Sequence, residues 1–196
     1  MLFVKLGPLV GGAFVVDGRL FTGHSYHAME LGHFVVDPLG SVCRCGKRGC
    51  LETVIGFDVI ANHLALLLSP ARLPILYHLT GGDKTKLTME TIMESFDLNE
   101  RIVVDILDGA LERFALTLVD AIGLIDPQRV TLYGVPFESA RFVALLHEKV
   151  KALAHGELSA ELVISNRNLQ LADLGCASIV IKDFLANGAK LTGSDV

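Results

Sequence analysis

The chain has 196 residues, 51% of them hydrophobic, and a formal net charge of −5 at pH 7. At roughly 100 to 200 residues per domain, this length allows one domain with a full hydrophobic core. The composition excludes disordered and fibrous classes. With 17 Lys and Arg residues against 22 Asp and Glu residues, the chain has no general electrostatic reason to bind a nucleic-acid backbone.

The mean hydropathy of +0.49 raises the question of a membrane segment. A membrane-spanning helix needs about 20 mostly apolar residues, whereas the best candidate, residues 116–125, contains Asp120 and is closed by Asp126-Pro127. The apolar amino end differs from a secretion signal, because glycines and Pro8 interrupt it and no small-residue cleavage site follows. We therefore expect no membrane association and attribute the apolar excess to a large core or a buried subunit interface.

Glycines and short β-type runs dominate the amino-terminal quarter of the chain. This pattern predicts strands at residues 2–6, 13–16 and 34–37. Apolar residues at 57–68 are too dense for a half-exposed strand and predict a helix, which Pro70 and Pro74 then break. The expected order is a strand meander with a loop-rich excursion, then a helix, a break and a short segment at 75–76.

The remaining part of the chain alternates helices with strands. Thr88 is a candidate N-cap for a helix over 88–96. The three-four spacing of apolar residues after Asn99 predicts a long core helix that ends at Gly123. Further elements are expected as a strand at 130–133, a turn at 134–136, a helix at 139–153, a strand at 162–164 and a helix at 171–185. This order indicates an α/β domain whose strands are covered by helices.

The cysteines carry the most specific signal. Cys43, Cys45 and Cys50 lie within eight residues, and His33 stands ten positions before the first of them. Zn²⁺ prefers tetrahedral nitrogen and sulfur donors, and a glycine-containing loop can fold three thiolates around one ion while the preceding segment supplies an imidazole. We therefore expect these four residues to bind zinc. Four protein ligands leave no position for an activated water, so the expected role is structural.

Other assignments stay open from the spacing alone. His24 and His27 precede His33 in the same stretch and compete with it for the fourth ligand position. The cysteines could also be reduced thiols or form disulfides that involve the distant Cys176, although neither explains their clustering with two glycines. Cys176 falls within an apolar helical pattern and is expected to be a small core residue.

Charged residues surround the expected zinc loop. Three basic residues lie inside it, Arg44, Lys47 and Arg48. They would offset the negative charge of three thiolates, or they are ordinary solvated charges. Glu30 lies three residues before His33, and Glu52 lies two residues after Cys50. A metal-clamped loop would hold both carboxylates in one place, where they could accept hydrogen bonds from the hydroxyls of a sugar.

The segment Glu30-Leu31-Gly32-His33, followed by Cys43-x-Cys45-Gly46-x-x-Gly49-Cys50-Leu51-Glu52, resembles the signature of the ROK family (repressor, open reading frame, kinase). The resemblance extends to Asp17-Gly18-Arg19-Leu20 and Asp126-Pro127-Gln128-Arg129-Val130. It implies an α/β fold of the actin-like ATPase (ribonuclease-H-like) type, with a mixed sheet covered by helices. This chain would be the carboxyl-terminal lobe over residues 1–186, with a zinc-stapled loop over 33–52 and a flexible tail over 187–196.

The resemblance also implies the roles of individual residues. The zinc ligands would be His33, Cys43, Cys45 and Cys50. The sugar contacts would be Glu30, His33 and Glu52, so that His33 would both bind the metal and touch the sugar. The ligand would be a small sugar or a sugar phosphate.

Departures from the family pattern favour a regulator over an enzyme. The sugar kinases of the family carry an Asp-x-Gly-Gly-Thr phosphate loop and a catalytic Asn-Asp pair, and neither occurs in this sequence. Kinases typically have Gly-Thr-Gly where this chain has Gly7-Pro8-Leu9, and Gly-Gly where it has Gly134-Val135. Proline lacks an amide donor, and leucine hinders close approach of a phosphate. These differences favour the NagC-like repressor branch.

We therefore expect the effector and oligomerisation lobe of a cytoplasmic transcription regulator, forming a dimer and reaching DNA only through an amino-terminal domain missing from this chain. The chain would be a fragment or a truncated reading frame. Met29 stands where the family usually has glycine, and its bulk would change which sugar fits or close the pocket. Two alternatives remain: the carboxyl-terminal half of a sugar kinase, and a zinc-stabilised interaction module without a ligand.

Overall fold

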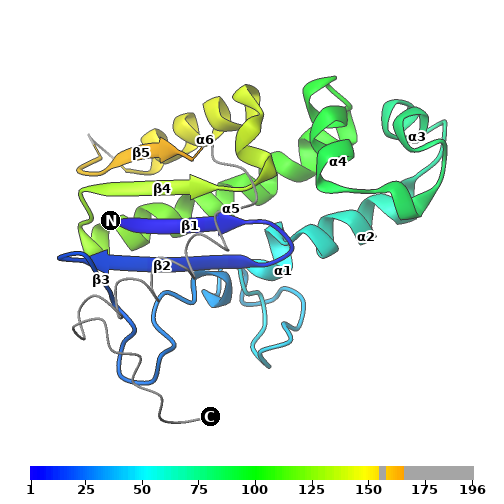
Figure 1. Cartoon of the computed structure of the whole chain (residues 1–196). Coiled ribbons are helices and arrows are strands. Elements are labelled where there is room, and N and C mark those ends of the chain that lie inside the picture. Colours follow the sequence, from blue (N-terminus) through cyan, green and yellow to red (C-terminus); the bar gives the residue numbers. More distant parts are fainter. Residues whose placement is uncertain (155–157, 166–196) are drawn as a thin grey trace, which may run out of the picture. The chain divides into compact units, whose positions relative to one another are not determined.

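The computed structural model describes residues 1–154 and 158–165 (Figure 1). The helix predicted at 171–185, the role predicted for Cys176 and the tail predicted at 187–196 lie outside these residues. Within the described part, five strands form one sheet in the order β3-β2-β1-β4-β5. Their bounds are β1 (Leu2–Leu6), β2 (Val10–Val16), β3 (Arg19–Leu20), β4 (Arg129–Tyr133) and β5 (Glu161–Ile164).

The sheet is mixed, as predicted. β1 pairs antiparallel with β2, and β2 pairs antiparallel with β3, so these strands form a meander. β1 pairs parallel with β4, and β4 pairs parallel with β5. Since parallel neighbours cannot be joined by a tight hairpin, the chain leaves the sheet after β3 and returns at β4. All the residues predicted to form the site lie in the first part of that excursion.

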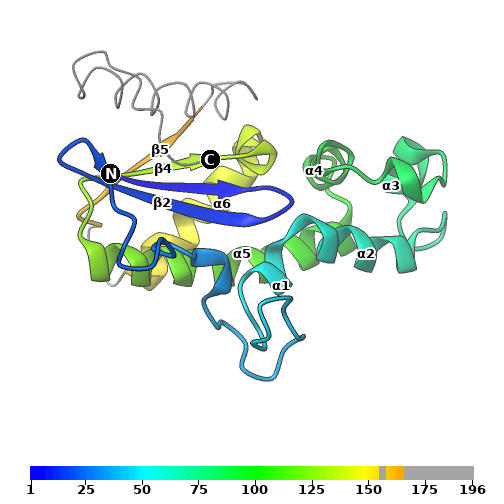
Figure 2. The ribbon, with the colours of Figure 1, turned by 60° about the horizontal axis from the view of Figure 1, so that its bottom comes forward.

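One face of the sheet packs against two helices, α5 (Arg101–Ile125) and α6 (Ala140–Leu153) (Figure 2). Alternate residues of β1 are fully buried, namely Leu2, Val4 and Leu6, as the two-residue period of a strand requires. The buried residues of α5 recur at the predicted three-four spacing: Val103, Leu107, Ala110, Leu111, Phe114, Leu118 and Ile122. The helix continues past the predicted end at Gly123 and closes at Asp126, which has a φ of 47°.

The remaining helices lie between β3 and α5 in the sequence. They are α1 (Glu52–Ile55), α2 (Phe57–Leu67), α3 (Pro74–Thr80) and α4 (Met89–Asp97), with the 3-10 turns η1 (Leu31–His33) and η2 (Lys84–Lys86). A third 3-10 turn, η3 (Val135–Glu138), follows β4. The predicted cap of α4 is confirmed, because the Thr88 hydroxyl accepts from the Thr91 amide and the Thr91 hydroxyl accepts from the Thr88 amide. No helix of the described residues has both the length and the apolarity needed to cross a membrane.

The strand predicted at residues 34–37 is wrong. The segment makes only an isolated bridge between Val35 and Cys50, and the amides of Val36 and Asp37 both donate to the carbonyl of Gly49. The apolar run that suggested a strand is partly exposed, with Phe34 39% and Val35 48% accessible. Its backbone instead wraps the cysteine-rich loop.

Candidate functional site

His33 is the last residue of η1, which packs directly on strand β2. A β-carbon at Gly32 would lie 2.5 Å from the carbonyl oxygen of Val10, so only glycine allows this approach. The same β-carbon would lie 3.3 Å from Oε2 of Glu52. The structure therefore places Glu52 beside the Glu30–His33 segment, although the two are separated by a long loop.

The loop between His33 and Glu52 is closed by its own backbone hydrogen bonds. The amide of Cys43 donates to the carbonyl of Lys47 at 2.7 Å, and the amide of Gly49 donates to the carbonyl of Ser41 at 2.8 Å. Gly49 has a φ of 66° and packs on the backbone of Asp37. These contacts turn the three cysteine side chains toward one point.

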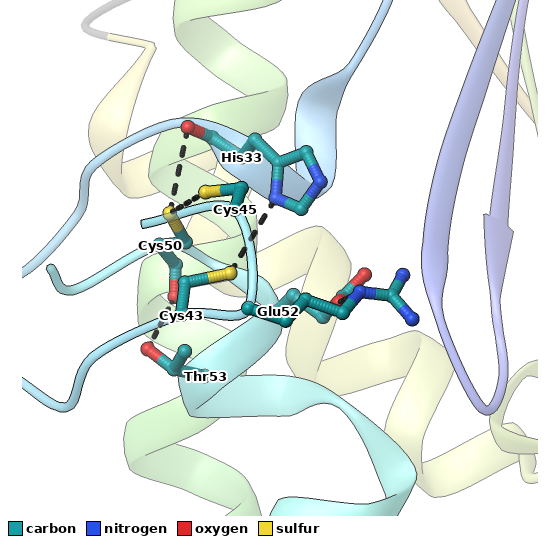
Figure 3. A network of polar contacts seen from close by, with 7 residues as sticks. His33, Cys43, Cys45, Cys50, Glu52 and Thr53 are labelled. Atoms are coloured by element: carbon teal, nitrogen blue, oxygen red, sulfur yellow. Dashed lines mark hydrogen bonds and ion pairs between the residues drawn. The ribbon is translucent and has the colours of Figure 1, made fainter. Parts of the chain in front are cut away.

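The structure brings together the four predicted metal ligands (Figure 3). The ligand atoms of His33, Cys43, Cys45 and Cys50 all lie within 4.8 Å of one another. Sγ of Cys43 is 3.6 Å from Nδ1 of His33, and Sγ of Cys45 is 3.6 Å from Sγ of Cys50. Tetrahedral zinc with ordinary Zn–S and Zn–N bonds separates its ligand atoms by about 3.6–3.8 Å. The group could therefore hold a metal ion without rearrangement of these pairs.

His24 and His27, the competing imidazoles, are not part of this group in the described chain. Both are exposed, and Nδ1 of His27 instead contacts the carbonyl of Ser25. The structure thus selects His33 among the three histidines that the spacing left open.

The thiols differ strongly in their surroundings. Cys43 and Cys50 are buried, whereas Cys45 is exposed. Burial, together with the neighbouring thiols, raises the pKa of Cys50 to about 12. A hydrogen bond from the backbone of Lys47 lowers the pKa of Cys45. A buried thiol of this kind ionises only when a cation compensates the charge, which is what a bound metal would supply.

Glu52 is the first residue of α1, and its side chain is only 11% exposed. Its Oε1 forms an ion pair with Nε of Arg44 at 3.1 Å. Arg44 thus pairs with a carboxylate. The sequence analysis predicted Arg44 only as a counter-ion for the thiolates or as an ordinary solvated charge. Nothing in the spacing signalled this pairing, because it depends on how the loop turns at Cys43.

The other basic side chains of the loop bind backbone. Nζ of Lys47 donates to the carbonyl of His33 at 2.8 Å, and Nη1 of Arg48 donates to the carbonyl of Gly40 at 3.3 Å. Lys47 therefore ties the middle of the loop to the residue that supplies the imidazole.

The two ring nitrogens of His33 face in different directions. Nδ1 faces Cys43, which leaves Nε2 for another partner. Figure 3 shows the imidazole ring and the Glu52 side chain extending to the same side of the thiol cluster. Glu30, which precedes η1, is exposed and makes no side-chain capping bond to that turn. An imidazole nitrogen and a carboxylate on one side of the cluster are suited to hydrogen-bonding hydroxyl groups.

Met29 adopts a left-handed backbone conformation, with a φ of 64°. Such a conformation is unfavourable for residues with a β-carbon and easy for glycine. Its side chain is half-buried and packs against the hydrophobic core. The methionine that stands in place of a glycine is therefore accommodated by packing of its side chain at the cost of backbone strain.

The second region singled out by the sequence joins the β1–β2 turn to the end of β4. Residues 7–9 form the turn, and Gly134 has a φ of 137°. A β-carbon at Gly134 would lie 1.9 Å from the carbonyl oxygen of Leu6. The two segments that depart from the kinase pattern thus meet at one end of the sheet. Pro8 lies in the first segment and Val135 in the second.

A groove of about 360 Å³ lies between α4 and η3 and was missed at the level of sequence. Its lining is acidic and includes Glu90, Glu94, Asp97 and Glu138. Glu90, Glu94 and Asp97 recur at helical spacing on α4, so the period of these acidic residues could have predicted an acidic helix face.

Comparisons with known proteins identify the family of the chain. A sequence profile of the ROK family matches residues 1–183. The chain is 25% identical over 184 residues to the DNA-binding transcriptional repressor Mlc of Escherichia coli K12, covering 93% of this chain and 44% of Mlc. It is 31% identical over 131 residues to a glucokinase of Thermotoga maritima, covering 67% of this chain and 41% of the glucokinase. The chain therefore spans less than half the length of these curated relatives.

Solved structures agree on the fold. A ROK family glucokinase from Streptomyces griseus, in complex with glucose and AMPPNP, superposes with a TM-score of 0.78 at 21% identity, covering 91% of this chain and 59% of that one. A ROK family transcriptional regulator homologous to E. coli Mlc superposes with a TM-score of 0.72 at 23% identity, covering 96% of this chain and 46% of that one. The relatives thus include both regulators and sugar kinases, and the match over most of its length shows that the chain belongs to the ROK family.

Proposed function

We propose that the chain is the sugar-sensing effector and oligomerisation lobe of a NagC-like transcription regulator. In this proposal the lobe covers residues 1–186, and operator DNA is bound by a domain outside this sequence. The protein acts in the cytoplasm as a homodimer. The regulators Mlc and NagC among its relatives support this role.

The metal of the proposed lobe is zinc, held by His33, Cys43, Cys45 and Cys50. Three sulfur donors and one imidazole within 4.8 Å of one another suit zinc better than a hard cation. Zinc bound by four protein ligands supplies charge neutralisation and rigidity. Its function here is to fix the loop that carries Glu52 and to orient His33.

The sugar site is formed by Glu30, His33 and Glu52. With Nδ1 directed toward the metal position, Nε2 carries the proton of a neutral imidazole and donates it in a hydrogen bond to a sugar hydroxyl. The two carboxylates accept hydrogen bonds from hydroxyls, a combination that suits vicinal diols. The ligand class is a small sugar or sugar phosphate.

The meeting of the β1–β2 turn with Gly134 is the observation that favours a regulator over a kinase. A kinase needs amide donors and open space for nucleotide phosphates. Pro8 supplies no amide hydrogen, Leu9 adds a side chain to the same turn, and Val135 packs against the core. This end of the sheet is consequently poorly suited to holding phosphates.

A second candidate, the carboxyl-terminal half of a ROK sugar kinase, is supported by the similarity to the T. maritima glucokinase. The kinase motifs, an Asp-x-Gly-Gly-Thr phosphate loop and a catalytic Asn-Asp pair, do not occur in this sequence, so an ATP-turnover assay on this chain separates neither role, and the gene sequence upstream of the chain does so instead. These kinase motifs upstream support the kinase, and a DNA-binding domain upstream supports the regulator. Isothermal titration calorimetry of the zinc-loaded protein with glucose, N-acetylglucosamine, N-acetylmannosamine and xylose tests sugar binding, which both candidates share.

Glu30→Gln is the matched variant for this test, because the Glu30 side chain is exposed. We expect about a tenfold loss of sugar affinity from a hydrogen bond to a charged acceptor, with zinc content unchanged. Glu112→Gln, at another exposed position on α5, is the control and should bind as the wild type does. Absence of heat with every sugar would leave the third alternative, a zinc-stabilised module without a ligand.

A further inference from the structure

The ion pair between Arg44 and Glu52 lies inside the proposed sugar site. The carboxylate of Glu52 is nearly buried, and Nε of Arg44 lies 3.1 Å from its Oε1. Glu52 also sits against Gly32 in the segment that carries Glu30 and His33. One of the carboxylates assigned to sugar hydroxyls is therefore already engaged by a cation of the same chain.

This engagement changes what the site can recognise. A neutral sugar that hydrogen-bonds to Glu52 has to compete with a charged donor, and hydrogen bonds to charged groups are stronger when both partners are ionised. The loop also holds Arg44 in position to compete, because Arg44 lies in the sequence between the candidate metal ligands Cys43 and Cys45. Arg44 thus lowers the affinity of the site for any ligand that relies on Glu52 alone.

The same guanidinium offers new donors. Its closest approach to Glu52 is through Nε, and no other described residue pairs with its two amino groups, Nη1 and Nη2. The edge formed by these two amino groups is the one that binds carboxylate or phosphate oxygens through parallel N–H donors. The Arg44 side chain is 60% exposed, so this edge is accessible to a ligand.

We propose that Arg44 is a specificity-determining residue, which makes the site prefer sugars that carry an anionic group, a carboxylate or a phosphate, over their neutral counterparts. This inference rests on the proposed sugar site. An anionic ligand binds the free edge of the guanidinium while the pair with Glu52 stays intact, so that Glu52 keeps a compensated charge. A neutral sugar has no such anchor and must share the acceptor oxygens of Glu52 with Arg44.

Calorimetric titration of the full chain tests this with sugars that share one ring. The probes are glucose, glucose 1-phosphate, glucose 6-phosphate and glucuronate, and the same set built on N-acetylglucosamine. In the wild type we expect at least one anionic member of a set to bind about tenfold more tightly than its neutral sugar. The phosphates and the uronate distinguish which anionic group the site takes.

Arg44→Ala should reverse this preference. Freed from its partner, Glu52 accepts from hydroxyls, so affinity for the neutral sugar rises while affinity for the anionic sugar falls about tenfold. Arg44→Lys keeps the charge but loses the two-pronged edge, and should retain only part of the preference. Arg48→Ala is the matched control, since Arg48 donates to the Gly40 carbonyl, and should leave both affinities unchanged.

Zinc content and melting temperature are measured for every variant, so that loss of the loop is not mistaken for loss of specificity. Sugar binding whose neutral-to-anionic ratio is the same in the wild type and in Arg44→Ala would overturn the role of Arg44 and leave the sugar site standing. Absence of binding to every probe, in both proteins, would overturn the proposed function and this inference with it.

Discussion

Gly49 lies against the backbone of Asp37 so closely that a β-carbon on it would come within 1.4 Å of the Asp37 carbonyl oxygen. Gly49 also accepts hydrogen bonds from the amides of Val36 and Asp37 through its own carbonyl. The contact joins the beginning of the loop to its end, one residue before the candidate metal ligand Cys50. The geometry of the candidate metal centre therefore depends on the absence of a side chain at this position.

Gly49→Ala should disrupt the metal centre far more than Gly46→Ala does. Both glycines have a positive φ, but a β-carbon at Gly46 would meet nothing within 4 Å. Gly46→Ala should cost about 1–2 kcal/mol from backbone strain alone, whereas Gly49→Ala adds a backbone clash and should cost more and reduce bound zinc. Urea unfolding and elemental analysis of both variants check this. Equal losses in the two variants would contradict it.

Removal of the metal should lower stability. Because a site of this kind is formed only in the folded chain, its binding free energy adds to the free energy of unfolding. Cys45→Ser should reduce zinc content and melting temperature together, and a chelator should reproduce the effect in the wild type. Cys176→Ser, which changes a cysteine predicted not to be a ligand, should keep its zinc. Unchanged metal content in Cys45→Ser would show that the ligand set is wrong.

Met29→Gly should be more stable than Met29→Ala. Both variants lose the half-buried methionine side chain, but alanine keeps the unfavourable left-handed backbone conformation that glycine adopts freely. We expect the difference to be about 1 kcal/mol in the free energy of unfolding. The comparison uses thermal and urea unfolding of the two variants under identical zinc loading. An alanine variant as stable as the glycine variant would contradict the strain at residue 29.

Glu100 should be needed for the start of α3. It is 6% exposed, and its Oε2 accepts hydrogen bonds from the amides of Ile75 at 2.7 Å and Leu76 at 3.1 Å. Glu100→Ala leaves these amides without their acceptor and should lower the free energy of unfolding by about 1–3 kcal/mol. Glu100→Gln retains an acceptor oxygen and should lose less. Similar losses for the two variants would argue against this capping role.

Sequence patterns predicted those features that depend on residues close together in the chain. The candidate ligands Cys43, Cys45 and Cys50 lie within one loop, so their spacing alone predicted a common position. The period of apolar residues located α5, and the cap at Thr88 located α4, because both signals are local. These predictions needed no knowledge of the tertiary structure.

Features that depend on tertiary contacts were missed. The apolar run at 34–37 resembles a strand, but the closure of the loop on Gly49 prevents it from pairing over its length. The ion pair between Arg44 and Glu52 follows from the direction in which the loop turns. The choice of His33 over His24 and His27 required the packing of η1 on β2.

If a metal organises this loop for sugar binding, sugar binding should depend on the metal. The most direct measurement is elemental analysis of tag-free protein, followed by calorimetric titration of the same sample with sugars before metal removal, after chelation and after zinc is restored. We expect one equivalent of zinc per chain and a sugar-dependent heat that is lost on chelation and regained with zinc. A protein without zinc, or a heat of sugar binding that chelation does not change, would contradict this expectation.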